Sequence, residues 1–302
     1  IYTIPFMIHV RKQKFILLIF ILSAGFLLFI LNGCFSSQSI REEAKIQNVE
    51  FLVQKGNEFW EKRHIPFNAE KACYFLTLAW NANPSDPALS ARVSQALYFQ
   101  AMFIEEDPSV KDSLFYQGYH VAITAIKNQP NFQTHFNESP GDSAIKWLSL
   151  LSEAPIEWVP GMFWWAVNEA KYLNNKPIME RLNKRELLEV IMHRIISLEP
   201  SYFYGGPYRF FGAFYTRIPG IELSQSKSYF DQAISAFPNY LGSQVYLAEF
   251  YHQKSGNREQ FHDVLQKVIQ FDTSILPEII PENIYYQSRA KSLLEQENIL
   301  FE

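Results

Sequence analysis

Cysteine and positive charge are both scarce in this sequence. Two cysteines among 302 residues exclude a disulfide framework and a cysteine-based zinc site. Lysine and arginine number 27 against 31 acidic residues, which gives a net charge of −4. A nucleic-acid binder needs a basic face, so that class is excluded. Hydrophobic residues make up 48% and charged residues 19%, which is typical of a globular chain.

The signature motifs of common enzymes are also missing. The chain has no P-loop, no Gly-x-Ser-x-Gly elbow, no His-Glu-x-x-His pair and no EF-hand loop. His252 and His262 could meet across a helix hairpin, but surface histidines are the simpler interpretation. We therefore predict no catalytic residue, no metal and no cofactor, and expect that the protein is not an enzyme.

Aromatic residues, in contrast, are abundant. The chain has 26 Phe, 16 Tyr and 6 Trp, together 16% of its residues. This excess indicates either a large aromatic core or an aromatic surface or channel that binds something apolar.

The N-terminus has the pattern of a secretory signal. A basic stretch from Arg11 to Lys14 precedes an apolar run from Phe15 to Leu31. The run ends in Leu31-Asn32-Gly33-Cys34, which resembles the lipobox of bacterial lipoproteins. The resemblance implies a signal peptide over 1–33, lipidation of Cys34 by acyl chains such as palmitate, and a tether over 34–41. The alternative is a signal anchor, because 17 apolar residues just span a bilayer.

The rest of the chain, residues 42–300, has the apolar spacing of helices, and one element recurs. Ala125-Ile126 precedes Pro130-Asn131-Phe132 with the same spacing as Ala233-Ile234 precedes Pro238-Asn239-Tyr240. Related versions end at Pro84 and Pro200. A helix that ends at a proline and is followed by a new helix is typical of tetratricopeptide (TPR) repeats. We predict an all-α fold of degenerate TPR-like repeats stacked into a single superhelical domain.

Two details of that fold are less regular. The interval from Pro130 to Pro200 is long enough for one extra helix pair, which we place around 144–151 and 162–173. The proline-containing stretch 153–161 is the best candidate for a break between halves, although we expect one continuous superstructure.

The densest unusual stretch runs from Tyr202 to Gly220. Gly205-Gly206 allows a tight turn, Pro207 suits the first position of a helix, and two arginines lie two helical turns apart. One interpretation is a tightly packed central helix whose arginines satisfy carbonyls or carboxylates. The other is a helix lining an aromatic cavity, with an arginine available to an anionic group. The candidate ligand-binding or pore-lining residues are Tyr208, Arg209, Phe211, Phe214, Tyr215 and Arg217.

The same stretch carries a family resemblance. The pattern from Gly205-Gly206-Pro207 to Arg217-x-Pro219 resembles the TPR-like T-component (TatT family) of tripartite ATP-independent periplasmic (TRAP) transporters. The helix 228–240 and the segment 247–261 fit the same family.

The resemblance implies a periplasm-facing lipoprotein that is not a catalyst. It implies association with the solute-binding P-component, homo-oligomerisation, for example as a trimer, and an apolar or amphipathic ligand. Phe35 after the lipidated cysteine favours the outer membrane over the inner one. A generic TPR scaffold for envelope or outer-membrane assembly is the competing hypothesis.

Overall fold

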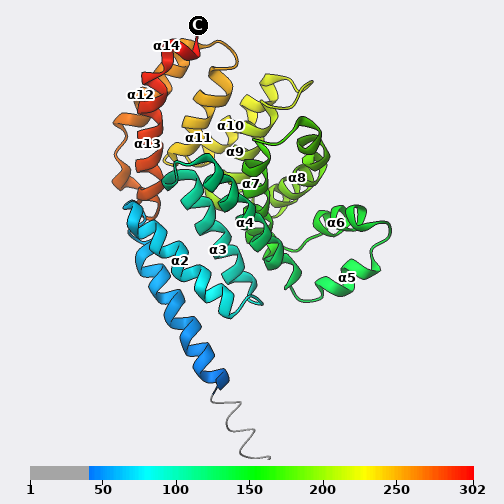
Figure 1. The fold of residues 1–302 in the computed structure, drawn as a ribbon. Helices are drawn as coiled ribbons and strands as arrows, with labels where there is room; N and C mark the ends of the chain where they lie inside the picture. The colour runs from blue at the N-terminus through cyan, green and yellow to red at the C-terminus, as the bar shows by residue number, and fades with distance from the viewer. Residues whose placement is uncertain (1–40) are drawn as a thin grey trace, which may run out of the picture. The chain divides into compact units, whose positions relative to one another are not determined.

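The computed structural model describes residues 41–302 (Figure 1). The predicted signal peptide and the lipidation site Cys34 lie outside the described residues. The chain divides after residue 51, and residues 52–302 form the second of its two units. Residues 41–51 of the first unit are helical, and the following paragraphs concern the second unit.

The second unit is all-α, as predicted, since residues 41–302 contain no strand. It opens with helical residues 52–60. The α-helices that follow are α2 (Pro66–Ala82), α3 (Pro87–Phe99), α4 (Pro108–Lys127), α5 (Phe132–Glu138), α6 (Ser143–Ser152), α7 (Val159–Leu173), α8 (Ile178–Leu198), α9 (Tyr202–Tyr215), α10 (Leu223–Ala236), α11 (Leu241–Tyr246), α12 (Arg258–Gln270), α13 (Ile280–Glu295) and α14 (Glu297–Leu300). Short 3-10 or π segments are η1 (Gln100–Ile104), η2 (Ile156–Trp158), η3 (Leu247–His252), η4 (Thr273–Ile275) and η5 (Pro277–Ile279).

Prolines end the helices where the recurring element predicts. Helices α2, α4, α8 and α10 stop two or three residues before Pro84, Pro130, Pro200 and Pro238. Proline disfavours the helical conformation in the residue before it and cannot donate the next backbone hydrogen bond. All four predicted helix ends are confirmed.

Aspartate caps fix several helix starts. The Asp86 carboxylate accepts a hydrogen bond from the backbone N–H of Leu89 at 3.0 Å. Asp107 and Asp142 accept equivalent bonds at the starts of α4 and α6. A carboxylate at this position satisfies free N–H groups and complements the helix dipole. Local sequence therefore sets these boundaries.

The extra helix pair expected between Pro130 and Pro200 is arranged differently from the prediction. Both helices exist, as α6 and α7, but α7 packs against α3, α4 and α8, while α6 packs against α8. Figure 1 shows α5 and α6 projecting beside the stack. Glycines explain the preference of α7 for α4, because a Cβ at Gly161 would lie 2.8 Å from Ile126 and one at Gly118 would lie 2.4 Å from Asn168. Only a glycine admits so close a helix contact.

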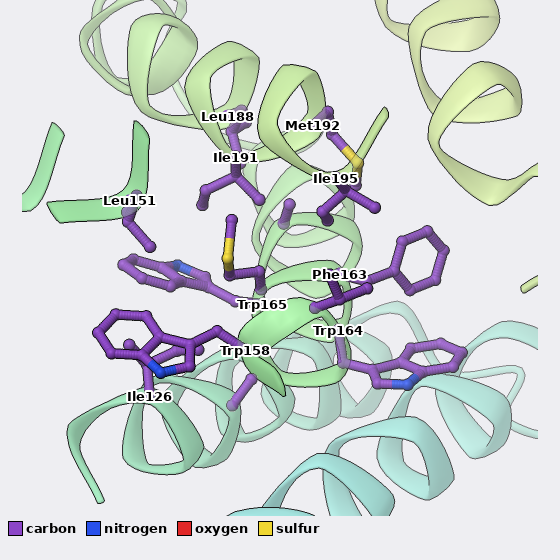
Figure 2. Packing of buried hydrophobic residues seen from close by; sticks show 14 of the residues in the cluster. Ile126, Leu151, Trp158, Phe163, Trp164, Trp165, Leu188, Ile191, Met192 and Ile195 are labelled. Carbon is purple, nitrogen blue, oxygen red and sulfur yellow. The ribbon is translucent and has the colours of Figure 1, made fainter. Parts of the chain in front are cut away.

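Two hydrophobic clusters form the core. The first surrounds α7 and α8, where Trp158, Phe163, Trp164 and Trp165 are almost fully buried (Figure 2). The second joins α11, α12 and α13 around Tyr240 and other aromatic residues. Phe203 at the start of α9 packs against both clusters. Much of the aromatic excess therefore forms core, and α9 is the element placed between the clusters.

Cys73 is a buried free cysteine that packs as a small hydrophobic residue. It lies on α2, 4% exposed, and burial raises the pKa of its thiol to about 12. The stretch 153–161 lies within the second unit and contains the buried Trp158.

Candidate functional site: an aromatic cavity lined by cations

Helix α9 begins with a left-handed turn. Phe203, Tyr204 and Gly205 have φ angles of 45°, 56° and 68°. For a residue other than glycine, this conformation costs about 1–2 kcal/mol. Right-handed helix resumes at Gly206-Pro207, in agreement with the predicted tight turn and proline start. The turn carries two aromatic side chains into positions that a regular helix would not give them.

Arg209 stabilises this turn. Its guanidinium donates hydrogen bonds to the Tyr204 carbonyl at 3.0 Å and the Phe203 carbonyl at 3.2 Å. It also donates to the Ser243 hydroxyl at 3.4 Å and lies 4.3 Å from the centre of the Tyr240 ring. Arg209 is 6% exposed. A buried guanidinium needs such partners, so Arg209 is engaged by the protein itself.

A cavity of about 160 Å³ lies between the two core clusters. Phe163 and Trp164 of the first cluster line one part of the cavity, and Tyr240, Tyr246 and Tyr286 of the second line another. The apolar lining suits an organic ligand with a sizeable apolar part.

The charge on the cavity lining has one sign. The lysine and arginine residues that line the cavity are Lys171, Arg181, Arg185, Arg209 and Arg217. Among the described residues that line the cavity, none is an aspartate or a glutamate. An apolar space with cations at its wall favours a ligand that carries negative charge.

Lys171, near the end of α7, is the most perturbed of these cations. Burial lowers the pKa of its ammonium to about 8, and the positive charge of Arg217 acts in the same direction. Its Nζ donates a hydrogen bond to the Tyr246 hydroxyl at 3.2 Å. At neutral pH the charged form predominates, although the surroundings oppose it.

A more open polar pocket adjoins the cavity. The two share Asn174, Arg181, Arg217 and Phe250. Arg217 donates a hydrogen bond to the Asn174 side-chain carbonyl and lies 4.9 Å from the centre of the Phe250 ring. The shared residues place this pocket directly beside the cavity.

The six candidate residues fall on two sides of α9. Arg209, Phe214 and Arg217 line the cavity. Three others face α10, with ring centres 5.0–6.4 Å from that of Tyr229, and do not line it: Tyr208, Phe211 and Tyr215. The structure therefore brings half of the candidates together at the cavity.

Helical spacing within α9 separates the two groups. From Gly206 onward, the α9 positions that line the cavity are 206, 209, 210, 213 and 214, and position 217 just after the helix continues the same i, i+3, i+4 pattern. That signal is present in the sequence and would have selected Phe210 in place of Phe211. The contribution of α7, including Trp164 and Lys171, has no comparable signal, because the sequence does not show which helices meet.

Within 41–302, no group of three or more His, Cys, Asp or Glu side chains is placed to hold a metal ion. His262 pairs instead with Glu297 at 2.7 Å. None of the helices described in that range has the length and apolar character to cross a membrane.

The fold and cavity define the protein as an all-helical, cavity-bearing protein. A comparison with family models places it further: the model described as TRAP transporter T-component matches residues 105–301, more than half of the chain. The chain belongs to this family, as its sequence resemblance indicated. It is thus a component of a TRAP transporter, associated with the bacterial envelope and with other subunits of that transporter. No curated protein matches the chain.

Proposed function

We propose that the protein is the accessory subunit that docks the solute-binding P-component of a TRAP transporter and holds its ligand in the cavity. The observation that carries this proposal is the aromatic-lined cavity between the two core clusters. In a protein that only scaffolds other proteins, such a space would lower the packing density of the core, and no bound ligand would offset the lost contacts. A ligand that fills it restores the lost contacts.

The start of α8 is the docking face that we propose. Ile178, Met179 and Leu182 are 53%, 65% and 43% exposed, although all three are apolar. Ile178 and Leu182 also line the cavity. An exposed apolar group beside an opening is typical of a surface covered by another protein. A partner seated there would meet the ligand as it enters or leaves.

Membrane attachment and assembly complete the proposal. We propose that acyl chains on Cys34 hold the protein at the envelope with residues 42–300 in the periplasm, at the outer membrane in preference to the inner one. We also propose that the protein forms a homo-oligomer, for example a trimer. Lipid attachment would keep the cavity near the membrane while the P-component diffuses to it.

Co-purification tests the docking role. The full chain, tagged after Glu302 and extracted from bacterial envelopes in mild detergent, is expected to retain a solute-binding protein in a fixed ratio. Met179→Glu places a charge on the proposed docking face and is expected to reduce the retained partner at least ten-fold. Lys127→Glu, on the exposed end of α4, is the control and is expected to retain it.

Two results would contradict the proposal. Retention of outer-membrane assembly proteins without a solute-binding protein would favour the envelope scaffold. Equal retention by Met179→Glu and the control would show that the docking face does not lie on α8.

Filling the cavity with Ala213→Phe is expected to leave docking intact and to abolish ligand uptake, because Ala213 lines the cavity.

A further inference from the structure

Helix α2 carries apolar side chains on two opposite faces. The face that packs into the second unit consists of small and aliphatic residues, namely Ala69, Ala72, Cys73, Leu76 and Ala79. On the opposite face, Phe67 and Tyr74 are 58% and 55% exposed, and Leu78 is partly exposed. Positions 67, 71, 74 and 78 share one side of a helix, so Phe67, Lys71, Tyr74 and Leu78 form an outer stripe. A helix that is apolar on both faces is expected to be covered on both.

The one charged residue in the outer stripe is Lys71. Its Nζ lies 5.4 Å from the centre of the Phe67 ring and 5.6 Å from the centre of the Tyr74 ring. The acidic Glu70 is exposed and lies at the edge of the stripe. Aromatic rings beside a lysine are typical of the membrane–water interface, because the ammonium reaches lipid phosphates while its alkyl stem and the rings stay among apolar groups. The stripe therefore has the composition of a lipid-contacting surface.

The chain that precedes the second unit leads to a membrane. A lipidated Cys34 and an uncleaved signal anchor would both hold the residues near position 34 at the bilayer surface. Residues 41–51 are helical, which corresponds to about 16 Å of chain, and residues 34–41 extend over at most about 25 Å. The start of the second unit at Leu52 then stays within about 40 Å of the lipid. Helix α2 begins 14 positions later, at Pro66, so lipid is within its reach.

We propose that the outer stripe of α2 lies on the surface of the membrane to which the chain is attached. Phe67 and Tyr74 enter the headgroup region, and the Lys71 ammonium binds lipid phosphate. The inference rests on the membrane attachment proposed above and adds the face of the protein that meets the lipid. A tether alone leaves the second unit free to rotate, whereas a contact through α2 fixes which side of the unit faces the membrane.

The size of the outer stripe favours lipid over a protein partner. A stable protein interface covers about 800 Å² on each partner, contributed by roughly 20–30 residues. The stripe offers four side chains on one helix. A lipid contact of this size is sufficient, because the attachment of the chain already supplies most of the membrane affinity and the stripe has only to orient the unit.

Labelling with an environment-sensitive fluorophore tests the inference. The full chain with Phe67→Cys is labelled with a nitrobenzoxadiazole (NBD) maleimide and reconstituted in vesicles of phosphatidylcholine and phosphatidylglycerol. The buried Cys73 does not compete for the label, and the parent chain taken through the same reaction supplies the background. Phosphatidylcholine with a nitroxide near the top of its acyl chain is expected to quench the label about two-fold. A label at Tyr74→Cys is expected to respond equally.

A matched control separates membrane contact from simple exposure. Ile145 on α6 is also apolar and 52% exposed, and a label at Ile145→Cys is expected to remain unquenched. Adding Phe67→Glu to the Tyr74→Cys chain is expected to reduce quenching at position 74 to the level of this control, because a carboxylate resists entry into the interface. Gln133→Glu adds the same charge on the exposed side of α5 and is expected to leave quenching at position 74 unchanged.

Each outcome decides. Sedimentation of the chain with the vesicles reports attachment separately, and a chain that stays in solution rejects both the attachment and the inference. If the chain sediments but the labels at 67 and 74 are quenched no more than the one at 145, the attachment stands and the inference is overturned. A blue shift without quenching would show that protein, for example a second copy, covers the outer stripe, and this also overturns it. Both labelled positions are exposed, so the substitutions are expected to leave the fold intact.

Discussion

Arg63 and Glu282 form a buried, bidentate ion pair that joins the two ends of the second unit. Arg63 Nε lies 3.1 Å from Glu282 Oε1, and Nη2 lies 2.7 Å from Oε2. Their side chains are 6% and 2% exposed. The guanidinium also donates to the Glu278 and Trp60 carbonyls. The pair attaches the segment before α2 to α13, although 219 positions separate the two residues.

Breaking this pair from one side is expected to be costly. Arg63→Met leaves the Glu282 carboxylate buried without a counter-charge, and such changes typically cost about 3–5 kcal/mol of folding free energy. Urea denaturation measures the loss. The double variant Arg63→Met/Glu282→Leu removes both charges and is expected to recover most of the stability. Simple addition of the two single losses in the double variant would contradict the buried pairing.

Arg209 is expected to act on stability. Arg209→Lys keeps the charge but loses the two carbonyl contacts of the left-handed turn, and we expect a loss of about 1–3 kcal/mol in urea denaturation. Arg181→Met, at an exposed arginine of the same cavity, is expected to change stability by less than about 0.5 kcal/mol. Equal losses in both variants would show that the turn does not depend on the Arg209 guanidinium.

Gly212 marks the closest approach of α9 to α10. A Cβ there would lie 2.7 Å from the fully buried Phe230 ring. Gly212→Ala gains about 1 kcal/mol of helix propensity but forces overpacking that typically costs about 1–3 kcal/mol, so we expect a net loss. Adding Phe230→Leu to Gly212→Ala is expected to reduce the penalty of the alanine. Thermal unfolding measures both variants, and a more stable Gly212→Ala would contradict the tight contact.

His252 is expected to weaken the fold in mild acid. It is 5% exposed, and its Nδ1 has no hydrogen-bond partner among the described residues. Burial is the main cause that lowers its pKa, and the positive charge of Lys227 lowers it further. An unfolded histidine takes up a proton near pH 6.5, so below that pH the unfolded state binds more protons and stability falls. His252→Gln is expected to lose less stability between pH 7 and 5 than the original chain. The exposed His135→Gln, as a control, is expected to match the original chain.

Thiol counting tests both cysteines at once. Since burial raises the pKa of Cys73 to about 12, the native protein is expected to be unreactive toward Ellman's reagent at pH 8. After denaturation, lipidated protein is expected to react with one equivalent, from Cys73. Two equivalents would show that Cys34 is not lipidated. Rapid reaction of the native protein would contradict the burial of Cys73.

The α9 region shows which structural features could be predicted from the sequence and which could not. The tight turn at Gly205-Gly206 and the helix start at Pro207 follow from backbone preferences, so they were predictable. The assignment of Arg209 to an anionic ligand was one of two open interpretations, and the structure favours the other, since its guanidinium meets the carbonyls of Phe203 and Tyr204. Those contacts depend on a left-handed turn at two aromatic residues, which propensity alone opposes.

The surroundings of Lys171 could not be predicted from the sequence. A lysine near the end of a helix is ordinarily a solvated charge that complements the helix dipole. Its hydrogen-bond partner Tyr246 comes from α11, and the charges that act on it come from Arg217, from η3, α13 and α4, all far away in sequence. Nothing in the spacing around position 171 indicates that these elements meet there. The site could therefore be found only after the helices were packed.

Local chemistry in the chain accounts for its helices, their proline ends and aspartate caps, and for the family to which it belongs, because each depends on residues close together in sequence. The packing of α7 on α4, the cavity between two cores and the lowered pKa of Lys171 depend on contacts between distant helices. Burial and close packing arise only when those helices meet, so the tertiary structure alone decides which side chains form the wall of the cavity and which form core.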